Sequence, residues 1–139
     1  MKRLILSILL LPLLSGCLTQ ANQGAEAAQI VKTVHQAFRD RNWDLIMPLY
    51  DKKFLELHSE KQWREDLQKM TADIGALKAV KSTFQQKDPR FGGDFYLYGF
   101  LLQYERATIS ETLTIYQGIN ADRLTISGHI LKTRKHDAS

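Results

Sequence analysis

The spacing of apolar residues changes at Gly75, and this change limits the chain to folds in which helices come before strands. Upstream of Gly75, apolar side chains recur at intervals of four, three and four residues, which places them on one helical face. These residues are Trp63, Leu67, Met70 and Ile74. From residue 77 onward the apolar residues alternate or run together, which is typical of strands. Glycine readily adopts the left-handed conformation that ends many helices, so Gly75 is expected to end this one.

Two more helices are predicted earlier in the chain. Residues 25–40 carry apolar side chains at spacings of three and four, so we expect an amphipathic helix there. A shorter helix is expected to start at Asp44, whose carboxylate can accept hydrogen bonds from the first free N–H groups. Residues 51–58 are expected to turn the chain. Ser59 followed by Gln62 has the form of a capping box, which predicts the start of the third helix.

Four strands are predicted in the second half of the chain, at residues 77–86, 95–105, 109–117 and 123–131. In the first, alternation places Val80, Ser82 and Phe84 on one face. The second is apolar on both faces, which predicts a central strand that is covered on both sides. About three helices followed by four strands predict an α+β domain, in which the helices pack on one face of a four-stranded antiparallel sheet.

The first residues of the chain form a separate feature. Lys2 and Arg3 precede a run from residue 4 to residue 14 in which Ser7 is the only polar residue. Eleven helical residues at about 1.5 Å each reach only about half of a ~30 Å hydrocarbon core. The run is therefore too short to span a bilayer and fits a cleavable signal peptide. It ends in the tetrapeptide Leu-Ser-Gly-Cys at residues 14–17.

This arrangement resembles the signal peptide of bacterial lipoproteins. The resemblance implies cleavage between Gly16 and Cys17 and a lipid on the Cys17 thiol, which would anchor the protein to a membrane. Cys17 is the single cysteine, so it has no partner for an intrachain disulfide. In such lipoproteins an Asp after the cysteine favours the inner membrane, and Leu18 here implies the outer membrane, facing the periplasm. The alternatives are a retained membrane anchor, or secretion with an unmodified Cys17.

The expected organisation has four parts: a signal peptide at 1–16, the lipidated cysteine and a polar tether at 17–24, one α+β domain at 25–132, and a polar tail at 133–139. Without residues 1–16 the chain keeps 17 Lys and Arg against 15 Asp and Glu, a net charge of about +2. The sequence predicts neither a concentrated basic face nor aromatic residues among the cations, and the basic end at residues 132–136 is read as solvated, with contact to anionic lipid head groups as the alternative. We therefore expect no nucleic acid partner.

A second resemblance covers most of residues 25–132. It is carried by Asn42-Trp43, Leu49-Tyr50, Phe54, Trp63, Gly75 and the segment Leu-Thr-Ile-Ser-Gly at 124–128. This succession resembles small periplasmic domains of the nuclear-transport-factor-2-like, or cystatin-like, superfamily. The resemblance implies a strongly curved sheet that encloses a cone-shaped cavity with the helices, which some members use as a pocket or active site and others fill. Those domains often have Trp where this chain has Leu124.

Residues able to carry chemistry are scattered along the sequence. The histidines lie in separate predicted elements without an i, i+4 pair, so we expect no metal site. The sequence has no nucleophile elbow, phosphate loop or dinucleotide fingerprint, and we expect no cofactor. The polar candidates on the predicted strands are Tyr96, Tyr98, Tyr104, Glu105, Glu111, Tyr116 and His129.

Two classes of function remain open. The first, which we favour, is a membrane-tethered, non-enzymatic module that binds a small apolar ligand or an envelope protein through a pocket or an exposed sheet face. Its candidate pocket residues are Trp43, Tyr98, Tyr104, Glu105 and His129, and no residue is assigned as catalytic. The alternative is a small hydrolase or isomerase that uses the cone, with Asp44, Tyr98, Glu105 or His129 as acid or base. A third option is self-association through an edge strand.

Overall fold

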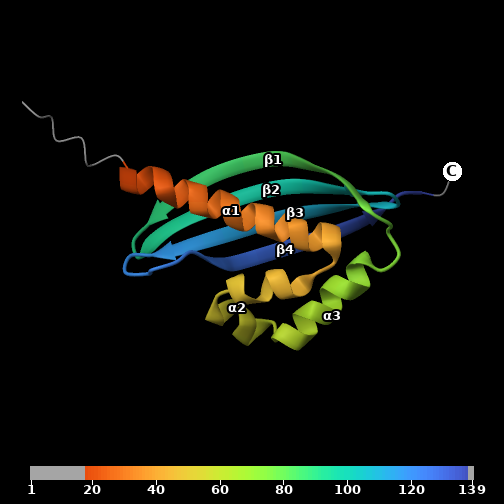
Figure 1. Cartoon of the computed structure of the whole chain (residues 1–139), viewed down its shortest axis with the longest axis horizontal. Coiled ribbons are helices and arrows are strands. Elements are labelled where there is room, and N and C mark those ends of the chain that lie inside the picture. Colours follow the sequence, from red (N-terminus) through yellow and green to blue (C-terminus); the bar gives the residue numbers. More distant parts are fainter. Residues whose placement is uncertain (1–17, 138–139) are drawn as a thin grey trace, which may run out of the picture.

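The computed structural model describes residues 18–137, and side chains from residue 24 onward. Helices occupy the first half and strands the second, as the change of period predicts (Figure 1). The elements are α1 (Leu18–Asp40), two short 3-10 helices η1 (Trp43–Leu45) and η2 (Met47–Leu49), α2 (Lys52–Leu57), α3 (Glu60–Thr71), β1 (Leu77–Arg90), β2 (Gly93–Tyr104), β3 (Ala107–Gly118) and β4 (Thr125–Lys135). The predicted signal peptide and Cys17 lie outside the described residues.

The four strands form one antiparallel sheet in the order β1-β2-β3-β4, so β1 and β4 are its edges. Helix α1 crosses one face of the sheet, and α2 and α3 lie beyond β4 (Figure 1). We call the face under α1 the inner face and the opposite one the open face. The expected α+β architecture with helices followed by a four-stranded antiparallel sheet is confirmed.

The hydrophobic core lies between the inner face and the helices. On β2 and β3 every second side chain is buried, which is the alternation expected of a sheet covered on one side. The inner-face residues of these two strands are Tyr96, Tyr98, Phe100, Leu102, Tyr104, Ala107, Ile109, Glu111, Leu113 and Ile115. Helix α1 contributes Val31, Val34 and Phe38 to the same core. The expectation that β2 is covered on both sides is therefore wrong, because its other face meets no helix.

Helix α1 starts at Leu18, seven residues before the predicted start at residue 25, so the backbone of 18–24 is helical. Its end falls where it was expected. Arg41 there adopts a positive φ of 52°, and the Asn42 N–H donates to the Ala37 carbonyl at 3.0 Å, which closes the last turn. The side chain of Arg41 also donates to the carbonyl of Thr71 at 2.9 Å and so joins α1 to the end of α3.

The segment between α1 and α3 differs from the prediction. Asp44 caps no helix: it lies inside η1 and pairs with Arg64 at 2.7 Å on the surface. The capping carboxylate is instead Asp51, which accepts from the Phe54 N–H at 2.7 Å and starts α2 in a segment predicted to be a turn. The predicted cap of α3 is confirmed, since Ser59 accepts from the Gln62 N–H at 3.3 Å.

Three further details depart from the prediction, one after helix α3 and two in strands. Helix α3 ends at Thr71, and Gly75 takes its positive φ of 81° in the loop that leads to β1. A register shift in β1 between Ser82 and Phe84 moves Phe84 to the open face, opposite Gly99. Strand β4 runs to Lys135, three residues into the predicted polar tail. Backbone pairing with β3 supports these residues, so their side chains need not be apolar.

Candidate functional site

A chain of four polar side chains crosses the core. The Glu111 carboxylate accepts from His35 Nε2 through Oε2 and from His129 Nε2 through Oε1, both at 2.7 Å. The Tyr50 hydroxyl lies 2.7 Å from the other ring nitrogen of His129, Nδ1. All four residues are buried, and Glu111 is only 1% exposed. We call this set, His35, Glu111, His129 and Tyr50, the buried relay.

Each member of the buried relay comes from a different part of the fold. Glu111 lies at an inner-face position of β3, His35 on the sheet-facing side of α1 and His129 on β4. Tyr50 follows η2 and is held by a backbone bridge to Ile126 of β4. Aromatic rings surround the relay, including Phe100, whose centroid lies 4.5 Å from that of the His35 ring. The relay therefore connects α1, the segment before α2 and both of the last two strands.

The charge of Glu111 sets the proton positions in the buried relay. Burial alone would raise the pKa of the Glu111 carboxyl, but the hydrogen bonds from His129 and His35 outweigh it and lower that pKa to about 2. At neutral pH the carboxylate carries no proton, so each imidazole must donate its Nε2–H. Where Nδ1 of His129 carries no proton, it accepts a hydrogen bond from the Tyr50 hydroxyl. Burial raises the pKa of the Tyr50 hydroxyl, which keeps it a donor.

The predicted site residues separate into two groups. His129 belongs to the buried relay, and Trp43, Tyr98 and Tyr104 are buried in the surrounding core. The hydroxyls of Tyr98 and Tyr104 have no hydrogen-bond partner among the described residues, and burial raises the pKa of both. The remaining candidate, Glu105, lies outside: it pairs with Lys78 at 3.1 Å in a partly exposed position.

Two members of the relay were not among the candidates drawn from the sequence. These are His35, which lies in the helix predicted at residues 25–40, and Tyr50, which follows the predicted start of the shorter helix at Asp44. Glu111 was one of several polar residues on a strand. The sequence does contain a signal for Glu111: the alternation of side chains along β3 places it on the same face as Ile109 and Leu113, which is the inner face.

A hollow of about 500 Å³ opens on the surface beside Tyr50. Met47, Pro48 and Leu55 give it apolar walls, and four charged residues stand around them. Those charged residues are Lys52, Glu56, Glu60 and Arg123. Tyr50 is thus the one member of the buried relay that lines this hollow.

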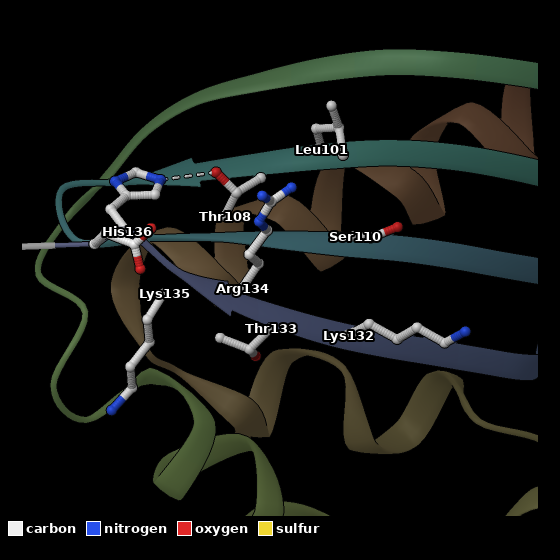
Figure 2. Close-up of a pocket in the computed structure, with 9 residues that line it drawn as sticks. Leu101, Thr108, Ser110, Lys132, Thr133, Arg134, Lys135 and His136 are labelled. Carbon is white, nitrogen blue, oxygen red and sulfur yellow. Dashed lines mark hydrogen bonds between the residues drawn. The ribbon is translucent and has the colours of Figure 1, made fainter.

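A second hollow, of about 640 Å³, lies on the open face where β3 begins and β4 ends (Figure 2). Its residues are Leu101, Thr108, Ser110, Lys132, Thr133, Arg134, Lys135, His136 and Asp137. Figure 2 shows Arg134 reaching from β4 across β3 towards Thr108 and Leu101, while Lys135 points away. His136 Nε2 lies 3.0 Å from Thr108 Oγ1 and fixes the end of the chain against β3. We call this hollow the basic groove.

The cations of the basic groove form no ion pair with the described residues, whereas some other basic residues do. Arg64, Lys78 and Lys87 each pair with a carboxylate within 4 Å. Lys132, Arg134 and Lys135 pair with no carboxylate in the part of the chain that the structure describes. Their positive charge is therefore available to an anion from outside the molecule.

Strand register extends this positive charge across the sheet. Lys81 of β1 stands opposite Leu101, Leu101 opposite Ser110, and Ser110 opposite Lys132. Residues directly opposite one another share a face. This row on the open face therefore has a hydroxyl and a leucine at its centre and a cation at each edge strand.

Between residues 18 and 137, no group of three or more His, Cys, Asp or Glu side chains is placed to hold a metal ion. Over the same range, no helix is both long and apolar enough to cross a membrane. No protein-family model matches the chain, and neither a curated protein nor a solved structure similar to it was found.

Proposed function

We propose that the protein is a non-enzymatic binding module of the bacterial cell envelope that presents the open face of its sheet to a ligand or partner. The observation that carries this proposal is the basic groove. It lies on the face that no helix covers, and it holds Lys132 and Arg134 without ion-pair partners among the described residues. Binding therefore needs no rearrangement of the core.

The tether in this proposal is a lipid on Cys17 after cleavage behind Gly16, in the manner of bacterial lipoproteins, with the body in the periplasm at the outer membrane. The support is the signal-like run at residues 4–14 and the Leu-Ser-Gly-Cys segment that ends it. Helix α1 begins at Leu18, directly after Cys17. Its 23 residues span about 35 Å at ~1.5 Å each. The basic groove lies near the other end of α1 and would point away from the membrane.

The domain would belong to the nuclear-transport-factor-2-like class, with the cone between sheet and helices filled. In support of a filled cone, inner-face residues such as Leu102, Ile109 and Leu113 are fully buried. Both carboxylate oxygens of Glu111 accept hydrogen bonds from histidines. The buried relay then stabilises the core, and ligand binding takes place on the opposite face.

Photocrosslinking in intact cells tests the binding role. A photoreactive residue at Thr112, on the open face, should form a defined adduct, whereas one at the exposed Gln68 of α3 should not. Mass spectrometry of the amino-terminal peptide tests the tether, and it should give an acylated Cys17. An unacylated Cys17 or an intact Met1 would refute the tether, and equal labelling at both positions would refute the open face as the binding surface.

A second function, a small hydrolase or isomerase, is favoured by one observation. Tyr50 lines the hollow of about 500 Å³ and is hydrogen-bonded to His129, which is hydrogen-bonded to Glu111. In such a chain His129 would take the Tyr50 proton, and the Tyr50 oxygen would act as a base or nucleophile towards a substrate in that hollow. Turnover of ester or enolisable ketone substrates that is lost in Tyr50→Phe would support this function. If the wild-type chain turns over neither substrate class, the enzymatic function is refuted.

A further inference from the structure

We propose that the ligand of the open face is a single anionic amphiphile, with a phosphate or carboxylate head in the basic groove and an alkyl tail along the neighbouring apolar row. This inference rests on the proposed binding function and names the chemical class of ligand. It follows from two features that adjoin on one surface: cations without partners, and exposed apolar side chains.

The head-group site is built from β3 and β4. Lys132 and Arg134 alternate with Thr133 on β4, so both project on the open face, and Ser110 and Thr108 stand opposite them. The two cations and the Ser110 hydroxyl can together donate to several oxygens of a phosphate or carboxylate, while the Thr108 hydroxyl is hydrogen-bonded to His136. The side chain of Arg134 lies over β3 in Figure 2, which brings its guanidinium to the centre of the groove.

The tail site is the next row of the sheet. Phe84, Gly99, Thr112 and Ile130 stand opposite one another across the four strands. Phe84 is 44% exposed and Ile130 57% exposed, although both are large and apolar. Gly99 leaves room for the Phe84 ring, since a Cβ at that position would collide with it. The sheet thus offers a low apolar strip about 7 Å from the row of Lys132, two residues along the strand at ~3.4 Å each.

A free amphiphile suits this face better than the membrane surface does. Helix α1 covers the inner face, and Leu18 at its start adjoins the proposed anchor Cys17. If the open face lay on the bilayer, a helical layer roughly 10 Å thick and the sheet would separate Cys17 from the lipid. A lipid chain on Cys17 and contact of the open face with the same bilayer therefore compete. A ligand that reaches the open face from the periplasm is free of this conflict.

The test is isothermal titration calorimetry of alkyl phosphates with the full chain in nanodiscs of zwitterionic phosphatidylcholine. The heat measured with empty nanodiscs is subtracted, because it comes from ligand that enters the lipid. Decyl phosphate should bind, and inorganic phosphate and decanol should each bind at least tenfold more weakly. A methylene that is half to fully buried changes affinity about two- to fourfold. Hexyl phosphate should therefore bind about 15-fold to 250-fold more weakly than decyl phosphate. Equal binding of the two would refute the tail site.

Charge-matched variants locate the head. The double variant Lys132→Gln with Arg134→Gln should bind decyl phosphate at least tenfold more weakly. The control double variant, Lys61→Gln with Lys69→Gln on the exposed side of α3, should bind it with unchanged affinity. Equal losses in the two double variants would refute the groove.

Ile130→Thr keeps a β-branched side chain and should reduce the advantage of decyl over hexyl phosphate without changing the contribution of the phosphate head to binding. An unchanged chain-length dependence would contradict the apolar row as the tail site.

The remaining outcomes separate this inference from the proposed function. If Thr112 crosslinks in cells and Cys17 is acylated but decyl phosphate does not bind, the amphiphile is wrong and the binding module stands. Hydrogen exchange of the backbone amides of residues 108–112 tests docking on a bilayer. If phosphatidylglycerol nanodiscs slow this exchange and decyl phosphate does not, the open face docks on anionic bilayers and the inference is overturned. If neither Thr112 crosslinks nor decyl phosphate binds, both proposals fail.

Discussion

The two faces of the sheet differ in how their charged side chains are placed: the charge on the inner face is buried and hydrogen-bonded, and those on the open face are exposed. On the inner face, the carboxylate of Glu111 is 1% exposed and both of its oxygens accept hydrogen bonds from histidines. On the open face, Lys132 and Arg134 are exposed and meet no described carboxylate within 4 Å. The same sheet therefore has a buried polar cluster whose charge is hydrogen-bonded on one side, and exposed cations without described ion-pair partners on the other.

The contrast shows which face has charge that the fold itself requires. A buried charge without partners is costly, so the inner face can hold Glu111 only because two imidazoles surround it. An exposed cation is solvated and needs no partner to be tolerated. The polar groups of the inner face should thus control stability, and those of the open face should control binding. Each prediction below tests one side of this division.

The largest effect is expected from removal of the inner-face charge. Glu111→Ala leaves His35 and His129 without their acceptor and opens a space in the core, so the free energy of unfolding should fall by about 3–5 kcal/mol. Urea denaturation measures this loss. The matched control is Thr112→Ala, one residue along β3 on the open face, which should cost less than about 1 kcal/mol. Similar losses in the two variants would contradict the division between the faces.

Acid should remove the same contribution gradually. The pKa of Glu111 lies at about 2 in the fold, lowered from 4.5. A carboxyl with a lowered pKa stabilises the fold above its unfolded pKa and loses that contribution as the pH falls towards the folded pKa. Unfolding free energies should therefore decline between about pH 4.5 and pH 2, by on the order of 3 kcal/mol. Glu111→Ala should show a shallower decline, and parallel curves for the two proteins would contradict this assignment.

A smaller effect is expected from single hydroxyls on the inner side. Tyr50→Phe removes the donor to His129 Nδ1 and should cost about 1–2 kcal/mol, because a buried acceptor is left unpaired. Tyr98 provides the control, since its buried hydroxyl has no described partner. Tyr98→Phe should leave the unfolding free energy unchanged or raise it by up to about 1 kcal/mol. Thermal and urea unfolding of the two variants should separate them, and a greater loss in Tyr98→Phe would overturn the relay.

Local patterns in the sequence predict the parts of the fold that local chemistry decides. The helical spacing of Trp63, Leu67 and Met70 and the cap at Ser59 both correspond to α3, because a cap and an amphipathic stripe act within a few residues. The alternation of apolar residues predicts four strands. It fails at Phe84, because a register shift in the backbone changes the face without changing the sequence period.

The buried relay depends on contacts that no local pattern encodes. His35 and Glu111 are 76 residues apart in sequence, and Tyr50 and His129 are 79 apart. Of the predicted pocket residues, His129 alone joins the relay, since its neighbours come from other elements. The basic groove was missed for another reason. The last residues of β4 are polar and look like a tail, although backbone pairing continues to Lys135.

The smallest effect on stability is expected from the cations of the open face. Arg106 lies at the same end of the sheet but donates to the Asp73 carbonyl at 3.0 Å, so Arg106→Gln should cost about 1 kcal/mol. Lys132→Gln with Arg134→Gln breaks no described ion pair and relieves repulsion between neighbouring cations. The unfolding free energy should therefore change by less than about 0.5 kcal/mol, or rise. A loss as large as that of Arg106→Gln would show that these charges stabilise the fold. An unchanged value leaves binding as the property to which Lys132 and Arg134 contribute, because the sheet then folds equally well without them.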